Sequence, residues 1–263
     1  MMSRREASHD LRSGVATAVD SGALSLRYQP VVSLVTGEAR GFEALAWWAH
    51  PSSDTNQSAA AFARADKTGL GASLDMWILD HALADIPQLC TTPGRFVSVN
   101  ISSGLLDAPG FATDISDRLS STGTDPSSLM LEIPEDVSLH NHASALSGLI
   151  TLHDLGVRIA LDNYGTGSAT LANLRQSTID AIKLDQSFAT DLLGIRNRRI
   201  LNAVIGLADD LGTLLIATQV DDRRTLDDLV ALGCRHAQGI LFAPAVPLRV
   251  ALAWRGELPQ LPK

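Results

Sequence analysis

At residues 26–48 the chain reads LRYQPVVSLVTGEARGFEALAWW, and this segment predicts how the sheet begins. Two segments within it, 26–34 and 39–48, have the β-branched, aromatic and apolar residues typical of strands. The tight turn around Thr36-Gly37 that joins them is too short for a crossover helix, so the two strands should be antiparallel neighbours. We therefore expect a sheet that opens with an antiparallel pair.

The rest of the chain alternates between segments with strand character and segments with helical spacing. The expected strands are 96–102, 129–134, 157–163, 181–187, 214–220 and 236–240. The expected helices are 73–86, 143–156, 196–212 and 223–233. Repeated strand-plus-helix units indicate a parallel sheet, and about eight strands indicate its closure. The predicted fold is an α/β, TIM-like (βα)8 barrel with an antiparallel first strand. Residues 1–20 are expected to form a short N-terminal arm and residues 21–263 a single barrel domain.

Composition excludes several classes of protein. The chain has 263 residues, of which 45% are hydrophobic, and no apolar run of the roughly 18 residues that a membrane span needs. Its formal net charge of −8 argues against charge-driven binding of nucleic acid. The N-terminus has no apolar stretch of secretory type, so we expect a cytoplasmic protein that binds neither nucleic acid nor membrane. Cys90 and Cys234 lack metal-ligand spacing, which favours buried thiols over a disulfide or a nucleophile.

Polar residues stand at the carboxyl ends of most of the expected strands, where barrels of this type place their functional side chains. They are Glu43, Asn100, Glu132, Asp162 with Asn163, Lys183 with Asp185, Thr218 with Gln219, and Gln238. Carboxylate and amide oxygens are ligands for hard cations such as Mg²⁺ or Mn²⁺, and a lysine among them can bind a phosphate or a nucleophilic water. A single acid at a strand end is more often a helix cap. The recurrence of the same register on several strands favours a common site.

These residues together resemble the EAL family of cyclic di-GMP phosphodiesterases. The resemblance runs from about residue 26 to residue 250. It is carried by Glu-Ala-Leu at 43–45 and by the segments VSVNIS, LMLEIPED, LDNYGTGS, IKLDQSF and VALGCRHAQGILF. It implies a TIM-like barrel with an antiparallel first strand, and a site in which two metal ions promote hydrolysis of cyclic di-GMP.

The resemblance implies a role for each matching residue. The ligands of the first metal ion, Mg or Mn, match Glu43, Asn100, Glu132 and Asp162. Lys183 matches the lysine that positions the attacking water, and the ligand-binding positions are Gln29, Leu45, Trp47 and Gln238. The segment that couples the site to a dimer interface matches the loop Gly165-Thr166-Gly167, together with Asp221. A helix-capping turn is the simpler interpretation of that loop.

The departures from the family gather at its second metal site. Asn163 stands where the family has the second of two consecutive aspartates, and Thr218 stands where it has a glutamate that binds the second metal and assists the water. Gln219 replaces a glycine, and Asp221 replaces a glutamate. At the metal-binding positions, five acidic groups thereby fall to three, which are Glu43, Glu132 and Asp162. Three carboxylates can neutralise one divalent cation but not two close together. We therefore expect one Mg or Mn ion at most and no second metal.

Trp47 is a further departure, since the family has at this position an arginine that contacts the substrate phosphate. Loss of such a charge-assisted contact costs about 1.5–3 kcal/mol of binding free energy. Trp47 can instead stack on a guanine base. Packing of the indole against the barrel rim or a partner protein is the simpler alternative.

Three functions remain open on this sequence. The first, which we predict, is a degenerate EAL-domain protein that lacks efficient phosphodiesterase activity and acts by binding cyclic di-GMP or a partner protein. The second is a weak or Mn-dependent phosphodiesterase that produces linear pGpG, and the third is an interaction domain with no ligand. The matched first-metal quartet disfavours the third, and Asn163 with Thr218 disfavours the second. The predicted partners are cyclic di-GMP, a partner protein and a second copy of the chain in a homodimer.

Overall fold

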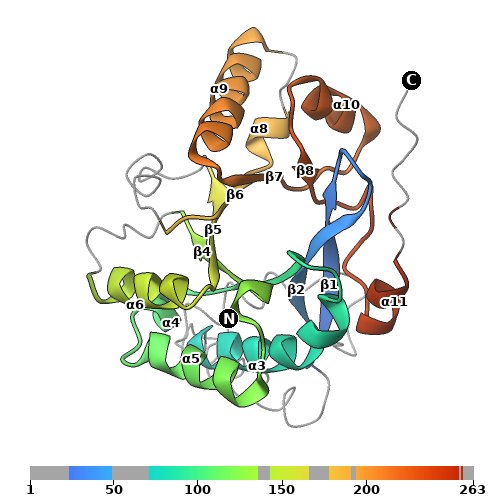
Figure 1. Ribbon diagram of the computed structural model, residues 1–263. Coiled ribbons are helices and arrows are strands. Elements are labelled where there is room, and N and C mark those ends of the chain that lie inside the picture. The colour runs from blue at the N-terminus through green and yellow to red at the C-terminus, as the bar shows by residue number, and fades with distance from the viewer. Residues whose placement is uncertain are drawn as a thin grey trace, which may run out of the picture.

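The computed structural model describes residues 24–48, 71–135, 143–165, 178–190, 194–254 and 256. Within them, eight strands close into one barrel in chain order (Figure 1). The strands are β1 (Leu24–Ser33), β2 (Ala39–Trp48), β3 (Phe96–Asn100), β4 (Leu129–Pro134), β5 (Arg158–Tyr164), β6 (Ala181–Leu184), β7 (Leu214–Ala217) and β8 (His236–Ala237). The expected arm at 1–20 lies outside the described residues, as do Thr166 and Gly167.

The first strand runs opposite to its neighbours. β1 pairs antiparallel with both β2 and β8, whereas β2 to β8 pair in parallel with one another. The reversal occurs after Ser33, where Gly37 has a φ of 78° and its N–H donates to the Ser33 carbonyl at 2.8 Å. Glycine adopts this left-handed conformation without steric cost, so the chain reverses within a few residues. The prediction of a TIM-like α/β barrel with an antiparallel first strand is confirmed.

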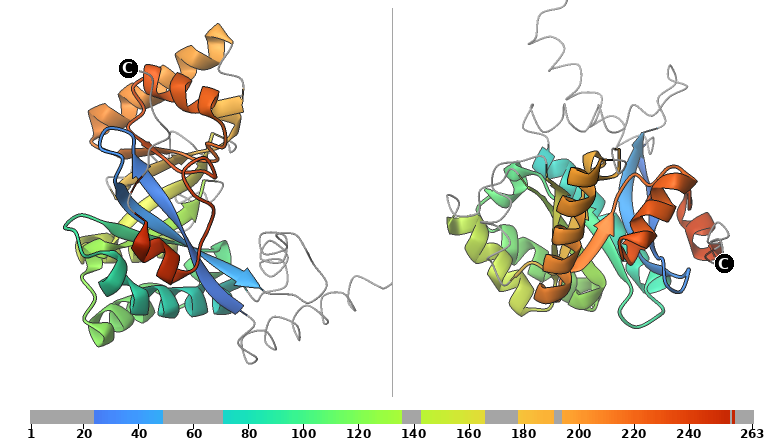
Figure 2. Two further views of the ribbon diagram at one scale, coloured as in Figure 1. Left: turned by 90° about the vertical axis from the view of Figure 1, so that its right-hand side faces the viewer. Right: turned by 90° about the horizontal axis from the view of Figure 1, so that it is seen from above.

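Helices cover the outside of the barrel. They are α3 (Gly71–Leu89), α4 (Ser103–Leu106), α5 (Phe111–Thr122), α6 (Ala143–Asp154), α8 (Ser187–Thr190), α9 (Ile195–Leu211), α10 (Arg223–Ala231) and α11 (Leu248–Ala253), with a short 3₁₀ helix at Pro126–Ser128. Figure 1 shows α3, α5 and α6 on one side of the barrel and α9 and α10 on the opposite side. α11 packs against β1, as Figure 2 shows. Every helix that the spacing predicts is present, with ends shifted by a few residues.

Several strands end earlier than the sequence predicts, the last three of the barrel by the most. β6, β7 and β8 each end three residues before the expected ends at 187, 220 and 240. Beyond β6, the Asp185 carboxylate accepts a hydrogen bond from the Ser187 backbone N–H at 2.8 Å, which begins α8. Beyond β7, Gln219 has a φ of 53°, which is incompatible with a strand. The chain therefore leaves the sheet where the candidate functional residues begin.

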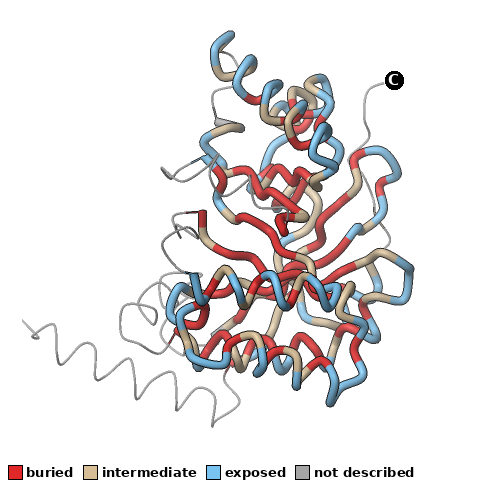
Figure 3. The backbone as a smooth tube through the Cα atoms, turned by 60° about the vertical axis from the view of Figure 1, so that its left-hand side comes forward, coloured by how far each residue is buried: buried red, intermediate tan, exposed pale blue. Residues whose placement is uncertain are grey.

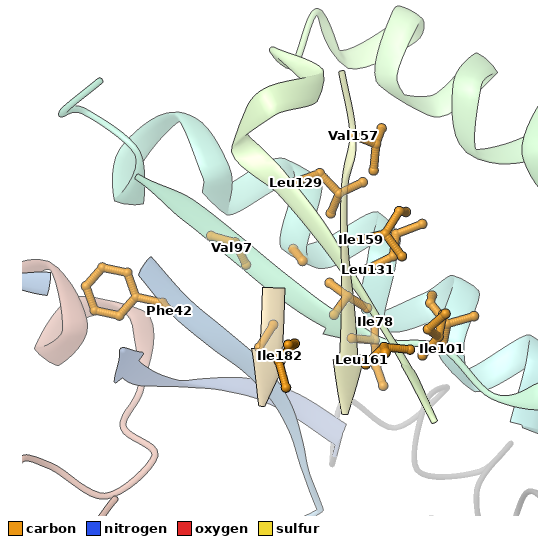
Figure 4. Packing of buried hydrophobic residues seen from close by; sticks show 14 of the residues in the cluster. Phe42, Ile78, Val97, Ile101, Leu129, Leu131, Val157, Ile159, Leu161 and Ile182 are labelled. Atoms are coloured by element: carbon orange, nitrogen blue, oxygen red, sulfur yellow. The ribbon is translucent and has the colours of Figure 1, made fainter. Parts of the chain in front are cut away.

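Alternation along the strands divides their side chains between two cores. The outward side chains pack under the helices, as Figure 4 shows for Leu129, Leu131 and Ile159 with Ile78 of α3. The inward side chains form a separate buried cluster of Val31, Phe96, Met130, Ala160, Ala181 and Ile216. The strands are accordingly buried along most of their length (Figure 3). The barrel interior near the amino ends of the parallel strands is a packed core. Ligand chemistry is therefore confined to the polar side chains at the carboxyl ends of these strands.

Gly41 makes room for this inner core. A Cβ atom at Gly41 would lie 2.6 Å from the ring of Phe96, which is closer than such atoms approach. The absence of a side chain at Gly41 thus allows Phe96 to fill the barrel interior.

Among the described helices, none combines the length and the hydropathy needed to cross a membrane. Cys90 and Cys234 are both free thiols; Cys234 is buried, as expected, whereas Cys90 is only half-buried. Burial raises the pKa of the Cys90 thiol to about 11, so this thiol is protonated at neutral pH.

Candidate functional site

A cavity of about 740 Å³ opens at the carboxyl ends of the parallel strands. Its volume is within the range of small-ligand pockets, about 300–1,000 Å³. Its lining includes ten of the residues that the sequence predicts for the site: Gln29, Glu43, Leu45, Trp47, Asp162, Asn163, Lys183, Thr218, Asp221 and Gln238. Asn100 and Glu132 adjoin it through hydrogen bonds to Glu43 and Lys183. The fold therefore brings the predicted metal-binding and ligand-binding residues together.

The Lys183 ammonium sits between three carboxylates. Its Nζ lies 2.6 Å from a Glu132 oxygen, 2.8 Å from a Glu43 oxygen and 3.8 Å from an Asp162 oxygen. Lys183 and Glu132 are almost completely buried, with exposed fractions of 2% and 1%. Strands β2, β4, β5 and β6 supply one residue each, because the carboxyl ends of parallel strands meet at one end of a barrel. Three of the four predicted metal ligands thus converge on one point.

Amide side chains fix Glu43 from two sides. Asn100 donates to one of its oxygens at 2.8 Å, and Gln238 donates to the other at 2.7 Å. Gln238 also donates to Gln29 at 3.1 Å, and Gln29 donates to the Ala243 carbonyl at 3.1 Å. The fourth predicted metal ligand, Asn100, and two predicted ligand-binding residues therefore belong to one network.

Burial and mutual interaction set the protonation of this cluster. Burial, and then the nearby charge of Glu43, raise the pKa of Glu132 to about 8. Burial also acts on Glu43, but attraction to Lys183 and hydrogen bonds from its neighbours outweigh it and lower the pKa of Glu43. Burial opposes the charge of Lys183, yet the surrounding carboxylates raise its pKa above the usual value. At neutral pH the cluster holds an ammonium, an ionised Glu43 and, in Glu132, the carboxyl that takes up a proton most readily.

Asp162 and Asn163 occupy an irregularity between β5 and β6. The register of the two strands shifts between Leu161 and Tyr164, and Asn163 has a φ of 53°. Bulges of this kind re-aim side chains and are frequent beside active sites. The Asn163 amide nitrogen donates to an Asp162 oxygen at 2.6 Å. Asn163 thus stabilises the neighbouring carboxylate, whereas an aspartate so placed would repel it unless a cation lay between them.

Thr218 and Asp221 form hydrogen bonds with the backbone of neighbouring segments. The Thr218 hydroxyl donates to the Leu184 carbonyl at 2.6 Å. The Asp221 carboxylate accepts a hydrogen bond from the Ile240 N–H at 3.0 Å and so joins the segment after β7 to the segment after β8. Thr218 is uncharged and its hydroxyl hydrogen is already engaged, so it is no substitute for a carboxylate base. The role of Asp221 in dimer coupling stays a prediction.

The donor atoms suit one divalent cation. Within the described ranges, no group of three or more His, Cys, Asp or Glu side chains stands ready to hold a metal ion. The Lys183 ammonium occupies the centre of the three carboxylates instead. These carboxylates are nevertheless hard oxygen donors, and beside them Gln238 has a buried Oε1 with no hydrogen-bond partner in the described part of the chain. The set fits one Mg or Mn ion once the ammonium moves aside, while Asn163 and Thr218 offer no charge to a second.

Arg27 reaches the cavity although it does not stand at the carboxyl end of a strand. β1 is antiparallel, so the end of β1 at the mouth of the barrel is its amino end. The Arg27 guanidinium lies 3.5 Å from the centroid of the Trp47 ring. One face of this indole is therefore covered from within the chain, in keeping with the simpler alternative of rim packing.

Glu135 is a second residue that the sequence analysis does not single out. Its buried carboxylate accepts a hydrogen bond from the Gly165 N–H at 2.8 Å. Gly165 has a φ of 109°, and a Cβ atom there would collide with the Phe188 ring. Gly165 lies against these two residues rather than among the described residues that line the cavity. The available signal is the position of Glu135, three residues after Glu132 and just beyond β4.

Comparison with known proteins identifies relatives of this barrel. Residues 12–245 match the EAL domain family. The uncharacterized protein Rv1357c of Mycobacterium tuberculosis is 35% identical over 248 residues, which are 91% of this chain and 81% of that one. The cyclic di-GMP phosphodiesterase PA2567 of Pseudomonas aeruginosa is 36% identical over 226 residues, 84% of this chain and 38% of that one. The solved PaMucR phosphodiesterase in its c-di-GMP complex has a TM-score of 0.83 at 27% identity, over 92% of this chain and 99% of that one. The chain therefore belongs to the EAL domain family.

Proposed function

We propose that this protein is a degenerate EAL-domain member that binds cyclic di-GMP without hydrolysing it efficiently. The observation that carries the proposal is the state of Asn163 and Thr218, the two substituted catalytic positions. Both are neutral, and their side chains donate to Asp162 and to the Leu184 carbonyl. A carboxylate base and the ligands of a second metal ion are therefore absent at these positions. Removal of a positioned base alone lowers a rate by about 10²–10⁴-fold.

Support for the ligand comes from the relatives and from the cavity. PaMucR was solved in a complex with c-di-GMP, and PA2567 is named as a cyclic di-GMP phosphodiesterase. The cavity of about 740 Å³ lies at the same strand ends as Glu43 and Lys183, and its lining combines charged, amide and apolar side chains. Such a lining can hold a nucleotide by its phosphates and its bases together.

We further propose that a single Mg or Mn ion is held by Glu43, Asn100, Glu132 and Asp162. A bound ion would polarise a phosphodiester oxygen and lower the pKa of a water molecule. Lys183 would then leave the carboxylates and donate to the phosphate or to that water. Neither of the substituted residues can take the proton of the water, so binding would proceed and hydrolysis would stall.

The alternative is a weak or Mn-dependent phosphodiesterase that produces linear pGpG. The convergence of three carboxylates on the Lys183 ammonium supports it, because these are the acids that match the ligands of the first metal ion. In that case Lys183 would orient the water, and turnover would be slow for want of a base.

A protein that binds a signalling nucleotide without consuming it needs an output. We propose a partner protein, and a homodimer coupled to the site through the segment that follows Asn163. The hydrogen bond from Gly165 to Glu135 connects the first residue of that loop to the residue just beyond β4, three positions after Glu132. A change at the metal ligands would therefore be transmitted to this loop.

The test is isothermal titration of cyclic di-GMP into the purified protein, with Mg, with Mn and with a chelator, followed by chromatography of the nucleotide. Saturable heat that settles, with intact cyclic di-GMP recovered, supports the proposal. Sustained heat after each injection and recovery of pGpG would establish the alternative. A flat trace under all conditions would exclude the nucleotide as ligand. Cyclic di-AMP is the matched control, because it has the same phosphodiesters and different bases.

A further inference from the structure

Arg27 lies on the face of β1 that points into the cavity. Residues two apart on a strand share a face, so Arg27 and Gln29 point the same way. Gln29 is paired with Glu43 across the two strands, and Arg27 is paired with Leu45, one step nearer the rim. Among the described residues that line the cavity, Arg27 is the one arginine.

The guanidinium of Arg27 keeps its charge and its hydrogen-bond donors. It is half-buried against the Trp47 ring, at 3.5 Å from the centroid, and contact with a neutral indole does not neutralise it. Within the described part of the chain, its one interaction is this contact with Trp47, and it has neither an ion-pair partner nor a hydrogen-bond acceptor there. By contrast, Arg118, Arg198 and Arg235 each pair with an aspartate, at 2.7, 2.7 and 3.1 Å. Arg27 thus differs from these arginines, because no described residue engages its N–H groups.

The lining of the cavity is acidic, so an anionic ligand would gain from the positive charge of Arg27. The described acids that line it are Glu43, Asp162 and Asp221, and the ammonium of Lys183 is engaged by carboxylates. An anion entering the cavity is repelled by these acids unless a cation compensates for them. A planar guanidinium stacked on an indole is restrained in orientation, and its N–H pairs match the oxygens of a phosphate. Position and charge therefore both suit a phosphate group.

Resting on the proposed function, we infer that Arg27, held on Trp47, contacts a phosphodiester of bound cyclic di-GMP. In this arrangement Arg27 is a binding residue and Trp47 is its positioning residue. The face of Trp47 that Arg27 covers is then closed to a guanine base, so the indole acts through the arginine on that side.

The test compares the wild type with Arg27→Ala in titrations with cyclic di-GMP. We expect binding to weaken by about 10- to 100-fold, the effect of losing a charge-assisted contact to a phosphate. The dependence of affinity on salt concentration should also become shallower, because one cation at the ligand is removed. Arg40→Ala is the matched control. Arg40 is on β2 but lines a separate cavity with Arg158 and His236, so the same charge is removed elsewhere and binding should stay within about twofold.

Trp47→Leu tests the positioning role. It should weaken binding less than Arg27→Ala, and adding it to Arg27→Ala should cause little further loss, since both remove one contact. Fully additive losses would contradict the assignment of Trp47. If Arg27→Ala fails to fold in a thermal unfolding control, Arg27→Lys replaces it. The lysine retains the charge but not the planar fork, and about 3- to 10-fold weaker binding is expected.

The outcomes separate the two proposals. Wild-type affinity in a folded Arg27 variant would overturn the role of Arg27 and leave the proposed function intact. Absence of cyclic di-GMP binding by the wild type would overturn both.

Discussion

The two halves of the barrel mouth differ in how they use their polar side chains. On the side of β2 and β4, Glu43 and Glu132 are buried acids that meet at the Lys183 ammonium. On the side of β5 and β7, Asn163 and Thr218 are neutral and bond to groups beside them. Both halves belong to the same closed barrel. Asn163 and Thr218 lie at or beyond strand ends, so the substitutions that we propose for the second half would change its chemistry without loss of a strand.

Restoring acids to the substituted half would remove the difference and should have the largest effect. We expect the combined change Asn163→Asp, Thr218→Glu and Gln219→Gly to raise the phosphodiesterase rate by about 10²–10⁴-fold. The base and the ligands of a second ion would return, and glycine would remove the steric cost of the positive φ at position 219. Formation of pGpG with Mg or Mn measures the rate.

The control for this gain lies in the other half of the mouth. Adding Glu43→Gln to the triple variant should abolish the gain, because it removes an acid from the first-metal quartet. A folded triple variant with no gain would show that the second metal site is not the main defect, and Trp47 would be the first residue to examine.

The other half of the mouth, which holds the acids Glu43 and Glu132, is called the intact half. Removing the Lys183 ammonium that pairs with these acids should have the next largest effect. Without metal, Lys183→Met leaves three neighbouring acids without their ammonium, and we expect the free energy of unfolding to fall by about 3–5 kcal/mol. Added Mg or Mn should recover part of this loss, because an ion that binds only the folded state stabilises it. Urea denaturation with and without the ion measures both effects.

An exposed ion pair provides the comparison for Lys183→Met. Arg235 pairs with Asp209 at 3.1 Å, and their side chains are 62% and 48% exposed. Arg235→Met should therefore cost less than about 1 kcal/mol. If the two variants lost the same amount, the acids of the intact half would have no need of a cation, and the single-ion site would be contradicted.

The same contrast shows what the sequence could predict. The antiparallel start follows from the short turn near Gly37, and the acids of the parallel strands follow from the strand-end rule, because both depend on local pattern. Arg27 could not be found in this way, since the rule assumes a parallel strand and β1 is reversed. Lys183 contacts Glu43 across 140 residues of chain, so its place between the carboxylates exists only once the barrel is closed. Asn163 likewise combines a hydrogen bond to Asp162 with a φ of 53°, and neither was predicted from the sequence.

The pH dependence of the free energy of unfolding offers a third test of the intact half. The pKa of Glu132 is raised from its ordinary value of 4.5 to about 8, so the folded protein holds this proton more tightly than the unfolded chain. Between these values, stability is therefore lost as the pH rises, by at most about 1.4 kcal/mol per pH unit for one proton. Chemical denaturation in chelator between about pH 5 and pH 8 measures the slope. Glu132→Gln should flatten it, and an unchanged slope in that variant would assign the proton to another group.

The smallest expected effect belongs to the substituted half. Asn163 and Gln219 are the two non-glycine residues with positive φ among those described, each at 53°. This conformation costs an ordinary L-residue about 1–2 kcal/mol, and asparagine tolerates it better than glutamine. Gln219→Gly should therefore raise the free energy of unfolding by about 0.5–1 kcal/mol after the entropy cost of glycine, and Asn163→Gly should give less. Thermal unfolding of the two variants measures the difference. A larger gain from Asn163→Gly would mean that the asparagine is held under strain, and that its hydrogen bond to Asp162 is not a favourable replacement for a metal ligand.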